Sequence, residues 1–414
     1  MKGIKKIISL VCIAVLIGSL FVGCGKKSET STTNQTNQTQ ETKTPKNLIV
    51  WSHLTDKEVA EVDKVAQEWA KKTGNTVKVQ ADKGDFQAYL QAANSSKAPD
   101  IMFGIAHDNL GTFQKAQLLA EVPSDVVDRS KYVPMALDAV SYDGKLFGIP
   151  LAMETYALFY NTDKLSAPPA TMEDLIAAGQ KNGFQYDINN FYFTYAFIAA
   201  NGGYVFKNNG GALDPNDIGL GNEGAIKGYQ MLADFVQKYK FMPATLKGDD
   251  AKAAFQKGKT ALYISGPWDV QGFKDAGVKF AVAPLPKTNG QPTPSFVGIQ
   301  AAFVNANSKN QAEAWDLMKY LVENTPMPLL KSGNRIPVLN SELEKDEVKN
   351  DSIISAFAEQ AKYGTPMPNI PEMAAVWKPA GDNLTLLTSG KSKPDAVAKN
   401  IVDQVKQGIA QQQK

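Results

Sequence analysis

The sequence predicts an α/β fold in which strands and helices alternate. Hydrophobic residues make up 43% of the chain and aromatic residues 9%, which is typical of a folded, water-soluble body. About 368 residues follow Lys46, and this is enough for two ordinary domains. Short apolar runs alternate with amphipathic segments from Asn47 onward, and this alternation favours a sheet with helices on both faces.

The first predicted elements form a βαβαβ unit, which favours a mostly parallel sheet. The apolar run from Asn47 to Trp51 is typical of a buried strand, and Thr55 with Glu58 forms a capping box that predicts a helix start. Apolar residues then recur at helical spacing until Gly74 ends the helix. The expected elements are a strand at 47–51, a helix from 55 to 74, a strand at 76–80, a helix at 85–97 and a strand at 99–103.

Later segments continue the alternation less regularly. Asp143-Gly144 predicts the turn of a hairpin over 142–149. The segment Thr171-Met-Glu-Asp174 begins another helix. We also expect strands at 260–264, 278–282 and 296–304, and helices at 222–240, 311–323, 351–362, 372–387 and 394–410.

Residues 1–23 have the build of a secretory signal peptide. Lys2, Lys5 and Lys6 give a positive start, and an uncharged apolar run follows from Ile7 to Val22. These 16 residues are short for a membrane span but suit a signal peptide. Nothing later in the sequence approaches 18 uninterrupted apolar residues, so we expect no second membrane span.

The signal ends at Gly23-Cys24 and resembles a bacterial lipobox, in which the cysteine is lipidated and becomes the first mature residue. Phe21 departs from that motif, which usually has an aliphatic residue there. An ordinary signal peptide with an incidental cysteine is the alternative. Residues 25–46 lack aliphatic and aromatic side chains, which predicts a disordered linker. We therefore expect a lipid on Cys24 and a tether that holds the body at the outer face of the cell membrane.

Charge and rare residue types exclude several functions. The formal charge is +2 and falls to −1 without the three signal lysines, so nucleic acid is not an expected partner. Once the signal is removed, Cys24 is the only cysteine left in the sequence, and His53 and His107 are its only histidines. A zinc site or a histidine-based triad is therefore hard to assemble. We expect no metal and no cofactor.

Two patterns hint at other functions. Gly219 to Gly224 matches the string G-x-G-x-x-G, but residues 214–218 before it are predicted as turn material, and no acidic residue stands at the required distance. We therefore expect a loop that enters a helix. Glu154, Asp108 and Asp56 could supply the carboxylates of an exported glycosidase, although no spacing brings two of them together. Such carboxylates can also bind sugar hydroxyls without any chemistry.

Aromatic residues beside polar loops favour a ligand cleft. Tyr192 stands at a helix start, Trp268 follows a strand, and Trp377 follows the segment Met367-Pro-Asn-Ile-Pro371. Flat aromatic faces at strand ends and helix entries suit stacking on sugar rings in an open α/β cleft. A place in the core is the alternative for Trp377, because apolar neighbours share its helical spacing.

Several short strings give the chain a resemblance to the maltose/maltodextrin-binding proteins, the extracytoplasmic solute-binding subunits of ABC sugar importers. They occur in the order of that family over about residues 48–405. Each string alone is weak, and together they are specific. They are 48–51, 99–103, 106–108, 118–121, 144–146, 159–161, 192–194, 202–204, 266–268, 296–298 and 367–371.

The resemblance implies a two-lobed, periplasmic-binding-protein-like (type II) fold with a ligand cleft and crossing hinge segments. Lobe 1 is expected at 47–152 plus 302–352, and lobe 2 at 153–301 plus 353–414.

The resemblance also carries ligand roles onto matching positions. Trp268, Trp377 and Tyr192 correspond to rings that stack on glucose units. Asp108 and Glu154 correspond to carboxylates that bind sugar hydroxyls. The loop from His53 to Lys57, with Asp56, corresponds to a first ligand loop that is about two residues shorter here.

Three positions depart from that family. Ile105 is the nearest occupant where a tryptophan is familiar, with one extra residue nearby. Asn109 stands where the family often has Arg, and Asn190 where it often has Glu. These changes bear on affinity and preferred sugar length, and both asparagines stay candidate ligand residues.

The resulting hypothesis is a carbohydrate-binding protein that captures maltose or maltodextrins by cleft closure and delivers them to an ABC transporter permease. It is expected to act as a lipid-anchored monomer and not as an enzyme. The alternatives are a binder of another oligosaccharide, such as a cyclodextrin or a differently linked glucan, an exported glycosidase, and a surface receptor that signals without transport.

Overall fold

The computed structural model describes residues 44–412, except 83, 85, 96 and 211. The described residues from Pro45 onward belong to one compact unit. The predicted signal peptide, Cys24 and the linker up to residue 43 lie outside the described residues, so they stay predictions.

The βαβαβ opening is confirmed. Strands β1 and β2 pair in parallel, and β1 also pairs in parallel with β3. The Thr55–Glu58 capping box forms as predicted, and Gly74 closes the helix with a left-handed φ of 74°. The second helix is shorter than predicted and ends at Ala92. The bounds are β1 (Asn47–Ser52), α1 (Asp56–Thr73), β2 (Thr76–Ala81), α2 (Phe86–Ala92) and β3 (Ile101–Ala106).

The sheet as a whole is mixed, so the prediction of a mostly parallel sheet is wrong. Its path is β14-β6-β13-β3-β1-β2, with β15 paired to β13. Strand β13 runs antiparallel to both β3 and β6, and β14 runs antiparallel to β6. These partners are far apart in sequence, and local patterns carry no information about their direction. The added bounds are β6 (Ile149–Thr155), β13 (Phe296–Val304), β14 (Ile336–Pro337) and β15 (Thr365–Pro366).

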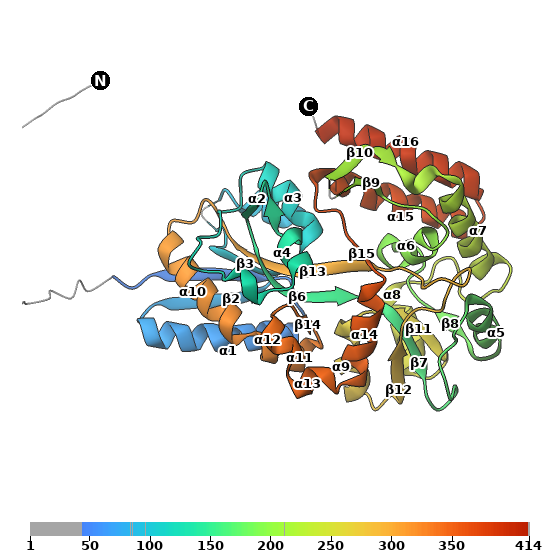
Figure 1. Ribbon diagram of the computed structural model, residues 1–414, viewed down its shortest axis with the longest axis horizontal. Helices are drawn as coiled ribbons and strands as arrows, with labels where there is room; N and C mark the ends of the chain where they lie inside the picture. Colours follow the sequence, from blue (N-terminus) through green and yellow to red (C-terminus); the bar gives the residue numbers. More distant parts are fainter. Residues whose placement is uncertain (1–43, 83, 85, 96, 211, 413–414) are drawn as a thin grey trace, which may run out of the picture. The chain divides into compact units, whose positions relative to one another are not determined.

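A second sheet has the order β12-β7-β11-β8. Strand β7 is antiparallel to β11 and β12, while β8 is parallel to β11. Figure 1 shows β6 and β13 running between the part that holds β1–β3 and the part that holds this sheet. The bounds are β7 (Ala157–Asn161), β8 (Phe184–Gln185), β11 (Leu262–Ser265) and β12 (Phe280–Ala283).

Two hydrophobic cores accompany the two sheets. The first core includes Val50, Phe103 and Phe303, and the second includes Phe159, Phe235 and others. A two-lobed fold needs two such cores, because each lobe must bury its own apolar surface. The segment 302–352 contributes to both cores, so the predicted lobe boundaries stay a prediction.

The helices pack around these sheets. Helix α1 packs on β2, α10 and α11, while α14 packs on β12, and α16 covers α15 and α7. Their bounds are α3 (Leu110–Lys115), α4 (Pro134–Ala139), α5 (Met172–Asn182), α6 (Phe191–Ala199), α7 (Glu223–Gln237), α8 (Gly248–Gln256), α9 (Val270–Asp275), α10 (Gln311–Asn324), α11 (Pro326–Gly333), α12 (Asn340–Leu343), α13 (Asp346–Lys349), α14 (Ser352–Lys362), α15 (Ala374–Thr388) and α16 (Pro394–Gln412).

Two hairpins complete the fold. Asp143 and Gly144 have φ values of 51° and 76°, and they turn the chain between β4 (Ser141–Tyr142) and β5 (Lys145–Leu146) as predicted. The other hairpin pairs β9 (Phe206–Asn209) with β10 (Ala212–Ile218), where turn material was predicted. Because β10 is largely exposed, it is not the buried strand that a dinucleotide site needs.

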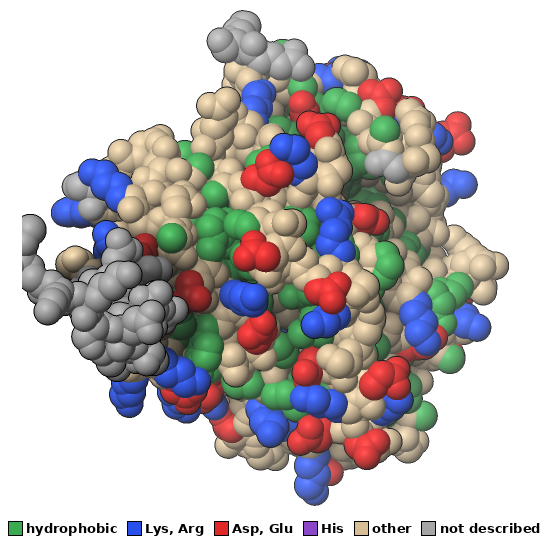
Figure 2. Space-filling view, turned by 60° about the vertical axis from the view of Figure 1, so that its left-hand side comes forward, with side chains coloured by type: hydrophobic (Ala, Val, Ile, Leu, Met, Phe, Trp, Pro, Cys, Tyr) green, Lys and Arg blue, Asp and Glu red, His purple; other side chains and the backbone are tan. Residues whose placement is uncertain are grey.

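The surface carries no obvious preference for one charge on the face shown in Figure 2, where basic and acidic side chains are interspersed. Among the described helices, none is both long and apolar enough to cross a membrane.

Candidate ligand-binding site

Four predicted ligand residues from distant segments are brought together. Trp377 Nε1 donates to Asp108 Oδ2 at 3.2 Å, although the two residues are 269 positions apart. Trp377 and Tyr192 both pack against Phe296, whose ring centroid lies 6.1 Å from that of Trp377 and 6.2 Å from that of Tyr192. The Tyr192 ring lies 6.3 Å from that of Trp268, measured between centroids. One carboxyl group and three aromatic rings therefore form a continuous cluster.

Trp268 lies in a 3₁₀ turn that directly follows β11, as the sequence predicts. Its ring is half-buried, and it lies 6.3 Å from the rings of both Tyr192 and Phe193. Phe193 is a neighbour that the sequence analysis missed, although the aromatic run around Tyr192 could have suggested it. These partners leave part of the Trp268 surface open for an apolar or sugar ligand.

Tyr192 is held at the start of α6. Its backbone N–H donates to Asn190 Oδ1 at 3.1 Å, so the predicted ligand residue Asn190 caps the helix, and its side chain is exposed. The Tyr192 hydroxyl is buried without a hydrogen-bond partner among the described residues. Burial raises its pKa well above the ordinary value, and the charges of Tyr156 and Asp108 add to this rise. Such an unpaired hydroxyl is suited to a polar ligand.

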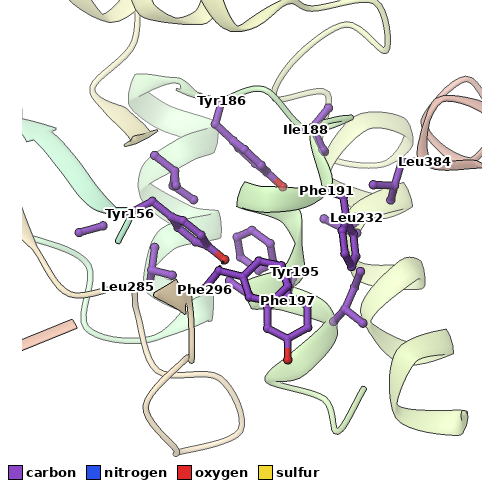
Figure 3. Close-up of a cluster of buried hydrophobic side chains, with 14 of the residues drawn as sticks. Tyr156, Tyr186, Ile188, Phe191, Tyr195, Phe197, Leu232, Leu285, Phe296 and Leu384 are labelled. Carbon is purple, nitrogen blue, oxygen red and sulfur yellow. Dashed lines mark hydrogen bonds between the residues drawn. The ribbon is translucent and has the colours of Figure 1, made fainter. Parts of the chain in front are cut away.

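Further aromatic rings pack against Tyr192 and Trp377 and hold them in place. Tyr156 meets the Tyr192 ring edge-on at 5.0 Å, and Phe296 lies 6.2 Å from Tyr192 and 6.1 Å from Trp377. Phe296 in turn stacks on Tyr195 at 3.7 Å, as the close-up in Figure 3 shows. Trp377 packs against the second core and its ring nitrogen donates to Asp108, while its role as a ligand residue stays a prediction.

Asp108 is the buried carboxyl of the cluster, with 7% of its surface exposed. Burial raises the pKa of Asp108 to about 7, against the smaller opposite effect of the Trp377 hydrogen bond. Asn109 Nδ2 donates to Asp108 Oδ1 at 3.3 Å and to Ala106 O at 3.0 Å. The amide at 109 therefore supports Asp108 directly.

His107 is used inside the protein. Its Nδ1 accepts from Ile299 N at 3.0 Å, and its Nε2 lies 3.0 Å from Met367 O. Because Nδ1 accepts, the proton is on Nε2, which donates to the carbonyl. Burial lowers the pKa of His107 to about 4. The neutral His107 imidazole therefore joins β13 to the segment around Met367, directly before Asp108 in the chain.

Glu154 belongs to a buried charge network. Its Oε1 accepts from Gln300 Nε2 at 2.8 Å, and its Oε2 pairs with Arg335 Nη1. Arg335 Nε also pairs with Glu58 Oε1 at 2.7 Å. Burial alone would raise the pKa of Glu58, but the Arg335 charge and the bonds from Arg335 and Thr55 outweigh it and lower the pKa. Both Glu154 oxygens are thus engaged by protein groups.

Sequence reasoning missed Arg335. It is one of two arginines in a chain that otherwise uses lysine, and this rarity was an available signal. A buried bidentate pair needs the planar fork of arginine, which lysine cannot replace.

The loop predicted to be the first ligand loop, 53–57, carries exposed polar side chains. His53 is exposed, with Nδ1 3.9 Å from Asp82 Oδ2, and Asp56 is also exposed. Lys57 pairs with Asp275 at the end of α9, the helix that follows Trp268. This ion pair links the loop to the neighbourhood of the ring.

Strand β3 contains a bulge next to Ile105, where one extra residue relative to the family was predicted. Ala301 and Ala302 pair with Ile105 and Phe103, which leaves Gly104 unpaired with a φ of 82°. Ile105 is 3% exposed and lies in the first core, so it offers no surface to a ligand. The stacking ring that the family pattern would place here has no replacement at this position.

A cavity of about 920 Å³ lies on another side of Phe296. His107, Tyr195 and Phe296 line its wall, together with residues of α4 and β9. None of the nine predicted ligand residues lines it. We therefore place the candidate site at the Trp268–Asp108 cluster, where aromatic faces and a carboxyl group occur together.

The described residues contain no group of three or more His, Cys, Asp or Glu side chains that could hold a metal ion. The chemistry available at the cluster is stacking and hydrogen bonding.

Comparison with known proteins gives relatives over nearly the full chain. Residues 64–356 match the model of the bacterial extracellular solute-binding protein family. A galactooligosaccharide-binding protein of Bacillus subtilis is 30% identical over 98% of this chain and 99% of its own length. A maltooligosaccharide ABC transporter solute-binding lipoprotein of Streptococcus pneumoniae is 31% identical over 96% of each chain.

A solved structure agrees with these relatives. The maltose-maltodextrin binding protein of Alicyclobacillus acidocaldarius has a TM-score of 0.84 and 38% identity, covering 87% of this chain and all of that one. This likeness confirms the predicted two-lobed type II fold, and the relatives are binding proteins, as expected, and not enzymes. The chain belongs to the bacterial extracellular solute-binding protein family.

Proposed function

We propose that this protein captures a maltodextrin-type oligosaccharide between its two lobes and delivers it to the permease of an ABC importer. One observation carries this proposal: the half-buried rings of Trp268, Tyr192 and Trp377 belong to one aromatic cluster, in which Trp377 donates to the buried carboxyl of Asp108. An aromatic face packs against the C–H face of a sugar ring, while a carboxylate accepts from its hydroxyls. The names of the Streptococcus and Alicyclobacillus relatives support an α-glucan as the ligand.

Closure of the two lobes would bury the sugar. The proposed lobes are 47–152 plus 302–352 and 153–301 plus 353–414. A ligand drives closure when it binds the closed form better than the open one. Trp268 lies in the turn after β11 of the second sheet, and Asp108 follows β3 of the first sheet. A sugar that contacts both would therefore favour the closed form.

Trp268, Tyr192, Trp377 and Asp108 are proposed as direct ligand residues. Asn109 and Asn190 are proposed at the edge of the site, where each already supports a neighbour in the cluster. Glu154 is proposed to contribute through the oxygen that Gln300 also contacts. His53 and Asp56 are proposed as contacts for the far end of a longer sugar, since both are exposed on the first loop.

An anchor at Cys24 completes the proposal. A lipid there, followed by the 25–46 linker, would keep the monomeric binder at the extracellular face near its permease, at high effective concentration. The family description supports an extracytoplasmic protein, and the word lipoprotein in the name of the Streptococcus relative supports the anchor. Mass spectrometry of the mature N-terminus tests it, and an unmodified residue there would contradict the anchor.

A ligand panel tests the proposed function. The purified protein is titrated by calorimetry with maltose, maltotriose, maltotetraose and a cyclodextrin, with a galacto-oligosaccharide as the matched competitor class. Saturable binding of the linear α-glucans is expected. Tight binding of the galacto-oligosaccharide alone would favour the differently linked alternative. Products released from maltotetraose would point to a glycosidase and overturn the proposal.

A further inference from the structure

The Trp268 ring lies directly over the backbone of Gly266. A Cβ atom added to Gly266 would stand 2.2 Å from both Cη2 and Cζ3 of Trp268 and 2.6 Å from Cε3. Carbon atoms do not approach this closely, so any side chain at 266 requires the indole ring to move. Gly266 itself has φ −103° and ψ −176°, which is extended backbone open to any residue. A glycine is therefore needed at 266 because the Trp268 ring leaves no space for a Cβ atom, and not because of the backbone conformation.

A second anchor holds the same turn from the other side. Asp269 is 4% exposed, and its Oδ2 accepts from Tyr263 Oη at 3.0 Å and Ser265 Oγ at 2.7 Å. Its Oδ1 pairs with Lys252 Nζ at 2.6 Å. Asp269 precedes α9, yet its side chain does not cap that helix. The carboxylate instead ties the turn that carries Trp268 to β11 and α8.

The ring also lies beside those of Tyr192 and Phe193, whose centroids are each 6.3 Å away. The indole is thus held by the Gly266 backbone on one side and by two rings at its flank, with its turn fixed by Asp269. A ring held in this way loses little rotamer freedom when a ligand stacks on it.

We propose that Gly266 and Asp269 are positioning residues that set the Trp268 ring for ligand stacking. This inference rests on the proposed function, because it assigns their role to sugar affinity. Without the glycine the ring tilts away from its partners, and without the carboxylate the turn loosens. In both cases the fold remains and the stacking surface is lost.

The first test compares Gly266→Ala with Gly272→Ala. Gly272 lies six residues further on in α9, and a Cβ there meets nothing within 4 Å. Near-ultraviolet circular dichroism and Trp fluorescence spectra are recorded without ligand. For each variant, the spectrum of the same variant with the added substitution Trp268→Ala is subtracted. This difference isolates the Trp268 signal. We expect it to change in Gly266→Ala and to stay constant in Gly272→Ala. An unchanged Trp268 signal in Gly266→Ala would overturn the proposal, and this readout needs no ligand.

The second test is a double-mutant cycle on maltotetraose affinity. Gly266→Ala is expected to weaken binding about tenfold or more in the natural chain and to have no further effect in the Trp268→Ala background. An equal loss in both backgrounds would mean that Gly266 acts on something other than the ring, and would overturn its assignment. If Gly266→Ala does not fold, Asp269→Asn replaces it in the same double-mutant cycle with Trp268→Ala. A natural chain that binds no sugar defeats the proposed function, and the spectroscopic result still decides the positioning.

Discussion

The two sides of the candidate site are held in place by different forces. On one side, Trp268 and Tyr192 are held mainly by contacts with other aromatic rings, and the Asp269 carboxylate fixes the turn that carries Trp268. On the other side, Asp108 depends on a hydrogen bond from Trp377, and Glu154 depends on its ion pair with Arg335. Contacts between aromatic rings do not depend on pH or salt. The charge of a buried carboxyl, by contrast, depends on the pH and on its hydrogen-bond and ion-pair partners. The aromatic side is therefore suited to affinity, and the carboxyl side to selectivity and pH response.

The carboxyl side should also carry the largest stability effect. Arg335→Met leaves Glu58 and Glu154 buried without their cation, and we expect a loss of about 3–5 kcal/mol in unfolding free energy. Urea unfolding followed by circular dichroism measures it. The matched control is Arg129→Met, because Arg129 is exposed, and its effect should stay within about 0.5 kcal/mol.

Adding Glu58→Gln to Arg335→Met sharpens this prediction. It removes one of the two unpaired charges, so part of the lost stability should return. Equal stability of Arg335→Met and the natural protein would show that the network does not hold this side together.

The aromatic side should carry the largest affinity effect. Trp268→Ala removes the stacking face, and we expect maltotetraose binding to weaken by about 2 kcal/mol, or roughly thirtyfold. Stability should change little, because the ring is half-buried. Tyr363→Ala, at an exposed aromatic residue, is the control. An unchanged affinity in Trp268→Ala would remove this ring from the site.

Asp108 should make binding pH-dependent. Its pKa of about 7 means that the carboxylate is lost as the pH falls below neutrality. If sugar hydroxyls donate to the ionised form, affinity should drop roughly tenfold between pH 8 and pH 6. Asp108→Asn should flatten this dependence. Trp377→Phe removes the hydrogen bond that lowers this pKa, so the midpoint should move to higher pH.

The same group should affect stability in the opposite direction. Because its folded pKa is raised above the ordinary 3.8, the folded protein holds a proton that the unfolded chain releases. The contribution of Asp108 to stability is therefore present at low pH and is lost as the pH rises through about 7. Unfolding of Asp108→Asn should show less of this loss, and an identical pH profile would contradict the raised pKa.

The smallest effect is expected at the ion pair between the two sides. Lys57→Ala breaks the exposed pair with Asp275, and ligand affinity should fall by less than about threefold. High salt should remove the difference, because it screens exposed charges. Lys64→Ala is a matched control, since Lys64 pairs with Glu61 within α1 and does not reach α9. A large effect at Lys57 that persists in high salt would mean that this loop contacts the ligand.

Local features of the fold were predictable from the sequence. The Thr55–Glu58 capping box, the helix start at Thr171 and the turn at Asp143-Gly144 formed as expected, because each is decided by residues within four positions of one another. The direction of β13 against β3 and β6 was not, because it depends on partners that are far apart in sequence.

The site divides in the same way. The structure brings Trp268, Tyr192, Trp377 and Asp108 together, and their role as ligand residues stays a proposal. The resemblance could not indicate that Trp377 donates to Asp108. The pairing of Arg335 with Glu58 spans 277 positions and follows no local rule. The hydrogen bonds that orient a site are long-range, and short patterns do not contain them.

A crystal structure of the protein with maltotetraose tests the central claim most directly. We predict a glucose ring stacked on Trp268, with hydroxyl groups within hydrogen-bond distance of the Asp108 carboxyl. Sugar bound instead in the cavity lined by His107 and Tyr195, with the Trp268 face empty, would contradict it.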